Sequence, residues 1–170
     1  RIQFGDGGDE LRRRLVRAAR RLGQYRLRLH EVPSAMRPAA EMHQAMGLGD
    51  GEFLPFAAAW PSVRDGYLRW LTGHEAAGAV FVSAETARSQ GLGTVKLVGR
   101  IDRIDRLQDG THLVLDYKTE ASAKTASRVK QALEDTQMAF YAALLPDDQL
   151  HGAYVNVGER DGTATFEQKD

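Results

Sequence analysis

The sequence predicts an α/β domain in the order helix, three-stranded meander, helix and strand. The first observation is a run of three strand-like segments, residues 79–86, 94–105 and 111–118, rich in β-branched and apolar residues. The second is helical spacing of apolar residues on either side of that run. With 170 residues, 42% of them apolar and 27% charged, the chain can build one globular core.

The first third of the chain is expected to be a helical extension, residues 1–58, placed before a core of residues 59–170. Asp9 precedes apolar residues at helical spacing that stop at Gly23, which predicts a capped helix. Prolines and glycines between residues 32 and 54 leave room for at most one short helix, at residues 39–46. Because the chain begins at Arg1 rather than Met, we expect it to be a fragment of a longer protein.

The elements of the core follow from changes in periodicity. Pro61 suits a first helical turn, and Val63, Tyr67, Trp70 and Leu71 then recur at helical spacing until Gly73 or Gly78. The turn at residues 108–110 joins the second and third strand-like segments as a hairpin, so the three strands should form an antiparallel meander.

After Thr119 the apolar period returns to 3.6, which predicts one long amphipathic helix ended by Pro146. Its apolar side would contain Val129, Leu133, Gln137, Phe140, Tyr141 and Leu144. Residues 152–157 and a last segment through Phe166 predict two closing strands.

Composition excludes several classes of site. The chain has no cysteine, which rules out disulfides, thiolate zinc sites, cysteine nucleophiles and a thiolate-held iron–sulfur cluster. It lacks an apolar stretch of about 20 residues and a signal peptide, so we expect a cytoplasmic protein with no membrane partner. The formal net charge is zero, which argues mildly against nucleic-acid binding.

Positive charge is nevertheless concentrated in the predicted first helix and just after it. That helix is either a solvated face or a surface that touches the phosphate backbone of DNA. The arginines concerned are Arg12, Arg13, Arg14, Arg17, Arg20, Arg21, Arg26 and Arg28.

Two strand-like segments place carboxylates where they can share a site. Side chains alternate along a strand, so Asp116 and Lys118 should project from one face, and Leu115 and Tyr117 from the other. Asp102, on the preceding strand, should meet Asp116 across the ladder. Two carboxylates in a partly dry site repel each other unless a cation lies between them. Mg²⁺ prefers oxygen ligands and keeps several waters, so we expect it here, with Lys118 as a catalytic group.

Three motifs in sequence order then resemble those of RecB-like nucleases, a branch of the PD-(D/E)xK superfamily that includes domains of the AddB type. Residues 99–102 are similar to the family's G-x-x-D strand, residues 116–118 to its D-x-K strand, and residues 137–141 to its Q-x-x-x-Y helix. Each motif is weak alone, but the three together, in the right order and spacing, are specific. The matching block covers about residues 80–158.

The resemblance implies a restriction-endonuclease-like core and a metal-dependent DNA nuclease. Asp102 and Asp116 would be metal ligands, Lys118 the catalytic lysine, and Gln137 and Tyr141 the pair that supports the site or touches DNA. The family also has an acidic residue on the strand before G-x-x-D, which corresponds to Glu85. Mg²⁺, replaceable by Mn²⁺, would be the cofactor, without an iron–sulfur cluster, and the cleaved DNA would carry a 5′-phosphate.

The family's wider context implies DNA as substrate and an exonuclease module in a helicase–nuclease that acts in DNA repair or recombination. The sequence departs from the family at the upstream helix, where relatives contribute a His to the metal site. His30, His43 and His74 are candidates by residue type only.

Plainer interpretations remain beside these. Asp102 and Asp105 could be exposed strand ends paired with neighbouring arginines, and Asp116 with Lys118 a surface ion pair. Tyr141 could be a packing aromatic, Glu85 a solvent-facing strand residue, and His74 a surface or helix-capping residue. The alternative function is a catalytically inactive nuclease fold that binds DNA or a partner subunit, and a third is a dimeric junction resolvase.

Overall fold

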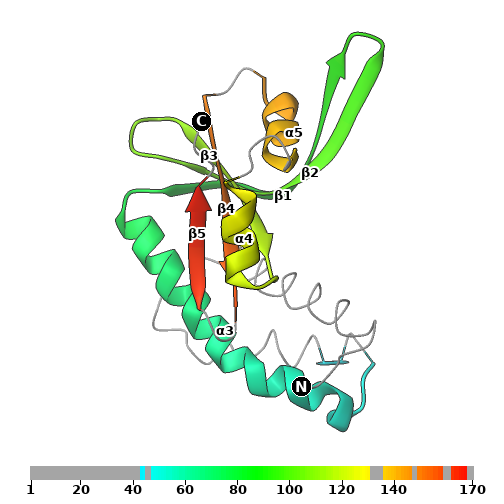
Figure 1. Cartoon of the computed structure of the whole chain (residues 1–170), viewed down its shortest axis with the longest axis vertical. Coiled ribbons are helices and arrows are strands. Elements are labelled where there is room, and N and C mark those ends of the chain that lie inside the picture. Colours follow the sequence, from blue (N-terminus) through cyan, green and yellow to red (C-terminus); the bar gives the residue numbers. More distant parts are fainter. Residues whose placement is uncertain (1–42, 45–46, 131–135, 147–148, 159–161, 168–170) are drawn as a thin grey trace.

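The computed structural model describes residues 43–44, 47–130, 136–146, 149–158 and 162–167. Its centre is a five-stranded sheet in the order β1-β2-β3-β4-β5, with helices on both faces (Figure 1). This confirms the α/β class and is consistent with a restriction-endonuclease-like fold. The strands are β1 (Val80–Leu92), β2 (Val95–Arg106), β3 (His112–Lys118), β4 (Leu150–Val157) and β5 (Thr163–Glu167).

The first three strands form the expected antiparallel meander. β1 pairs with β2 over nearly its whole length, whereas β2 pairs with β3 only from Arg103 to Arg106. β4 runs parallel to β3, which requires the chain to cross over a face of the sheet between them. β5 pairs antiparallel with β4 and completes the sheet.

Helix α3 (Asp50–Ala76) covers one face of the sheet. Its buried side chains recur at spacings of three and four and pack on alternate residues of β3 and β4. The side chains from α3 are Phe53, Phe56, Trp60, Val63 and Tyr67, and those from the strands are Leu113, Leu115, Tyr117, Ala153, Val155 and Val157.

The expected start of this helix at Pro61 was wrong. α3 begins eleven residues earlier, so Pro55 and Pro61 both lie inside it. The backbone N–H of Gly49 donates to Oε2 of Glu52 at 2.9 Å, which closes the first turn. Burial of Phe53, Phe56 and Trp60 offsets the hydrogen bonds that the two prolines cannot make.

Two separate helices, not one, lie on the opposite face. α4 (Ser122–Arg128) and α5 (Gln137–Leu144) replace the long helix expected after Thr119. Thr125 of α4 accepts a hydrogen bond from the Asn156 amide of β4 at 2.9 Å, whereas Met138, Tyr141 and Leu144 of α5 pack on β2, β3 and β4. Each helix is held at its own place on the sheet, which a single straight helix could not reach.

Several expectations fall outside the described residues. The helix expected at residues 9–23, its arginines and most of the short helix at 39–46 lie there. The division at residue 58 falls within α3 and stays a prediction. None of the helices in the described ranges is long and apolar enough to cross a membrane.

Candidate active site

Strand β3 presents Asp116 and Lys118 on the face covered by α5. Leu115 and Tyr117, the residues that alternate with them, pack against α3. Asp116 is only 3% exposed, because the end of α5 lies directly over it. The interpretation of Asp116 and Lys118 as a surface ion pair is therefore wrong, although the two are indeed paired.

Asp102 lies beside Asp116 on the neighbouring strand. The β2–β3 ladder ends with the pair Arg103 and Leu115, so the antiparallel register sets Asp102 opposite Asp116. Oδ2 of Asp102 accepts the backbone N–H of Tyr117 at 3.1 Å, and the residue is 6% exposed. The two carboxylates are thus buried together, as the sequence indicated.

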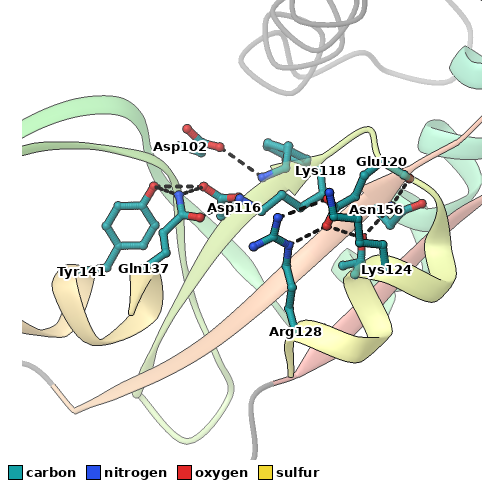
Figure 2. Close-up of polar contacts among 11 residues, drawn as sticks. Asp102, Asp116, Lys118, Glu120, Lys124, Arg128, Gln137, Tyr141 and Asn156 are labelled. Carbon is teal, nitrogen blue, oxygen red and sulfur yellow. Dashed lines mark hydrogen bonds and ion pairs between the residues drawn. The ribbon is translucent and has the colours of Figure 1, made fainter. Parts of the chain in front are cut away.

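Helix α5 holds one oxygen of Asp116 from two directions (Figure 2). Nε2 of Gln137 donates to Oδ1 at 2.7 Å, and the hydroxyl of Tyr141 donates to the same oxygen at 2.9 Å. The Gln137 amide also lies 3.0 Å from the Tyr141 hydroxyl. One helical turn separates Gln137 from Tyr141, so both reach the same carboxylate.

The ammonium of Lys118 lies on the other side of Asp116. Its Nζ is 2.7 Å from Oδ2 of Asp116 and donates to Oε1 of Gln137 at 2.6 Å. It also lies 4.9 Å from the ring centre of Tyr154, a cation–π distance. Gln137 therefore orients both charged groups, with its amide nitrogen on the carboxylate and its amide oxygen on the ammonium.

Burial raises the pKa of Tyr141 well above its ordinary value, and the negative charge of Asp116 raises that pKa further. A tyrosine in this setting remains protonated at neutral pH. Its hydroxyl consequently acts as a hydrogen-bond donor to Asp116 and not as a base.

The chemistry of the donor set fits a hard divalent cation. Oδ2 of Asp116 is buried and has no well-aligned hydrogen bond; its contact is the ion pair with Lys118. Among the described residues, no three His, Cys, Asp or Glu side chains gather as a complete metal-binding group. Two aspartates completed by water and substrate phosphate form the type of incomplete protein shell that Mg²⁺ accepts.

Glu85 occupies the strand position opposite Asp102. The pairs Ala84 with Arg103 and Thr86 with Ile101 flank it, and its backbone has a positive φ of 52°. Oε2 of Glu85 lies 3.6 Å from Nη1 of Arg100, so its carboxylate forms an ion pair with an arginine two residues before Asp102. Its role as a metal ligand stays a prediction.

The two described histidines among the candidates are engaged elsewhere. Nε2 of His43 lies 3.0 Å from the carbonyl oxygen of Leu48, and its ring stacks on Phe53. Nε2 of His74 lies 2.8 Å from Oδ2 of Asp105. His30 is outside the described residues. No described histidine lies in a metal-binding group with the aspartates.

Asp105 belongs to a buried charged cluster on the α3 side of the sheet. It is fully buried, and the Nε of Arg103 donates to both of its oxygens at 2.8 and 2.9 Å. The view of Asp102 and Asp105 as exposed strand ends is therefore wrong, and His74 is part of this cluster rather than a surface residue. The sequence signal that could have indicated this buried ion pair is an Asp two residues after an Arg on an otherwise apolar strand.

A second polar group, missed in the sequence, anchors α4 just beyond Lys118 (Figure 2). Glu120 accepts from Nε of Arg128 at 2.6 Å and lies 3.4 Å from Nζ of Lys124. The amide of Asn156, 1% exposed, donates to the carbonyl oxygen of Glu120 at 2.8 Å. These contacts hold the segment that follows the D-x-K strand against β4.

A sheet that carries neighbouring aspartates on β2 and β3 and a lysine at the end of β3, beneath a helix that supplies a Gln and a Tyr, has the architecture of a nuclease. The chain belongs to the PD-(D/E)XK nuclease superfamily, whose sequence model matches residues 9–169. No curated protein matches the chain.

Among solved structures, one described as "Crystal structure of SSO0001" is 17% identical, over 98% of this chain and 79% of that one, with a TM-score of 0.36.

Proposed function

We propose that this chain is a Mg²⁺-dependent deoxyribonuclease of the RecB-like branch, the exonuclease module of a larger helicase–nuclease in DNA repair or recombination. The observation that carries the proposal is the geometry of Asp116. Gln137 and Tyr141 both bond to its Oδ1, which leaves Oδ2 beside Lys118 and next to the strand of Asp102. This proximity of residues from all three segments that resemble RecB-like motifs supports the proposal.

The residues would divide the chemistry of phosphodiester hydrolysis among them. Asp102 and Asp116 would hold the divalent ion, and Glu85 is included as a third carboxylate because the strand register sets it opposite Asp102. When bound, Mg²⁺ or Mn²⁺ would polarise the scissile phosphate and acidify a water molecule. Lys118 would orient the attacking water and offset charge that develops on the phosphate oxygens. Gln137 would keep the Lys118 ammonium aimed at the reacting centre.

The partners of the proposal are DNA as substrate and a helicase domain or subunit, in the cytoplasm. An exonuclease needs a free DNA end, whereas an endonuclease does not, and this difference can be tested. Linear end-labelled DNA and closed circular DNA, incubated with Mg²⁺ or Mn²⁺, separate the two. We expect the linear DNA to be degraded and the circular DNA to survive.

The same digestion tests the site. Asp116→Ala and Lys118→Ala should each abolish metal-dependent cleavage, because one removes a ligand and the other the only ammonium in contact with Asp116 among the described residues. Asp109→Ala is the matched control, since Asp109 is an exposed turn residue that bonds to Thr111. Cleavage that persists in both site variants would refute the assignment.

The second candidate is a catalytically inactive nuclease fold that binds DNA or a partner subunit. It is favoured by one observation, that the two described candidates for the family's upstream histidine, His43 and His74, bond to Leu48 and Asp105 and not to the site. An inactive module would bind DNA equally well before and after Lys118→Ala and would cleave none with either metal.

A further inference from the structure

The outer halves of β1 and β2 form a two-stranded ribbon that extends beyond the rest of the sheet. β2 pairs with β3 only from Arg103 onward, so residues 86–92 and 95–101, here called the ribbon, pair only with each other. Figure 1 shows the ribbon projecting past α5. Gly93, with a φ of 59°, opens the two-residue turn at its tip, a position that favours glycine in a type II′ hairpin.

One face of the ribbon rests on α5. Leu97 packs into the cluster formed by α5, and a Cβ on Gly99 would lie only 2.7 Å from side-chain carbons of Leu144 and Phe140. A larger residue at this position would force the Leu144 and Phe140 side chains to shift. The base of the ribbon is therefore held in a defined direction, which an isolated hairpin in water would lack.

The other face of the ribbon is open to solvent. Residues opposite each other in an antiparallel pair share a face, so Ala87, Ser89 and Gly91 of β1 lie with Arg100, Val98 and Lys96 of β2. All six are exposed, and Val98 is 65% exposed. Small side chains on one strand thus flank a cationic and apolar row on the other.

All charged residues of the ribbon are basic. It contains Arg88, Lys96 and Arg100 and no Asp or Glu, in a chain that has 23 basic and 23 acidic residues in total. Lys96 makes no ion pair with any described residue, and the contact of Arg100 is the long one to Glu85, at 3.6 Å. A cationic ribbon with apolar side chains complements a polyanion that also presents apolar groups, and a two-stranded β-ribbon has the width of the DNA major groove.

We propose that the exposed face of the ribbon binds the DNA duplex that flanks the scissile phosphodiester, with Lys96 on a backbone phosphate and Val98 against sugar or base. This inference rests on the proposed function. The ribbon starts next to Asp102, and Lys96 is six residues further out, about 20 Å along an extended strand. That distance corresponds to about six base pairs of duplex.

The test measures binding of the full chain to a labelled duplex of about 30 base pairs, without divalent metal, over a series of salt concentrations. Lys96→Gln should weaken binding about three- to tenfold and reduce the slope of log affinity against log salt by about one, because one phosphate contact is lost. Val98→Ser should weaken binding and leave the slope unchanged, because its contact carries no charge. Arg69→Gln, an exposed cation on α3, is the matched control and should change neither value.

The outcomes separate the inference from the function on which it rests. If the unaltered chain cleaves DNA with Mg²⁺ but Lys96→Gln and Val98→Ser bind like Arg69→Gln, the ribbon proposal is wrong and the nuclease stands. If the chain binds DNA through the ribbon but cleaves none, the catalytic proposal fails and the ribbon stands. If the ribbon instead joins two copies of the chain, sedimentation should show a dimer that Val98→Ser dissociates. Unchanged DNA affinity of that variant would then overturn the ribbon proposal.

Discussion

The hydroxyl groups of Tyr67 on α3 and Tyr117 on β3 lie 3.0 Å apart, on the face of the sheet opposite Asp116 and Lys118. Tyr117 stands between those two residues in the sequence, and its own backbone N–H bonds to Asp102. Nη1 of Arg103 lies 3.5 Å from the Tyr67 hydroxyl. The back of the strand that carries the candidate active site is therefore tied to α3 by buried hydrogen bonds.

Two matched tyrosine variants distinguish a hydroxyl that stabilises only the fold from one that also supports catalysis. Tyr67→Phe removes a hydroxyl behind β3 and should lower the free energy of unfolding by about 1 kcal/mol, with DNA cleavage per folded molecule unchanged. Tyr141→Phe removes a donor to Oδ1 of Asp116 and should lower cleavage as well. Urea unfolding and single-turnover cleavage measure the two effects. Equal cleavage by both variants would contradict the role given to Tyr141.

Gln137 orients both Asp116 and Lys118, so its loss should be felt in catalysis. Gln137→Ala should reduce cleavage by about 10- to 100-fold, the usual effect of removing a residue that orients a metal ligand. Gln108→Ala is the control, because Nε2 of that exposed glutamine donates to the carbonyl oxygen of Ala77 and not to a residue of the candidate site. Cleavage rates at saturating DNA give the comparison, and a rate for Gln137→Ala within twofold of the control would rule out the proposed role.

The buried pair of Arg103 and Asp105 should be costly to break from one side. Asp105→Ala leaves the Arg103 guanidinium without its carboxylate and should destabilise the fold by about 3–5 kcal/mol in urea unfolding. The double variant Arg103→Met with Asp105→Leu replaces both charges by apolar groups and should cost much less. An additive loss in the double variant would show that the pair does not act as a unit.

Binding of the divalent ion can be followed without cleavage. Mg²⁺ at concentrations well above its Kd should raise the Tm of the unaltered chain, because a ligand that binds only the folded state stabilises it. Asp116→Asn keeps the shape of the side chain but removes its charge, and its Tm should not respond to Mg²⁺. A rise in Tm of the same size in Asp116→Asn would place the ion elsewhere.

Glu120 makes stability depend on pH in the acid range. Its hydrogen bond from Arg128 holds the pKa of the Glu120 carboxyl below its ordinary value near 4.5. Because the folded-state pKa is the lower one, the stabilisation is present above pH 4.5 and is lost as pH falls through the folded-state pKa. Glu120→Gln should therefore be less stable than the unaltered chain at pH 7, with a difference that shrinks in acid. Urea unfolding between pH 7 and pH 3 measures this, and a constant difference would contradict it.

The candidate site was largely predictable because its signals are local. Strand alternation alone places Asp116 and Lys118 on one face, and a spacing of four places Gln137 and Tyr141 on one side of a helix. The meander and its turn followed from the same short-range patterns. Such patterns do not contain the depth of burial, so they left open the interpretation of Asp105 as an exposed strand end, although this residue is fully buried.

Local spacing along the chain therefore sufficed for the class of fold and the antiparallel meander, whereas the resemblance of three motifs assigned Gln137 and Tyr141 to the site at Asp116. Only the tertiary structure decided where α3 begins, because burial of Phe53, Phe56 and Trp60 against β3 and β4 outweighs prolines that in isolation would end a helix. It also decided that α4 and α5 are separate, since one helix is held by Asn156 and the other by Asp116. In each case contacts between residues distant in sequence override a local preference worth less free energy.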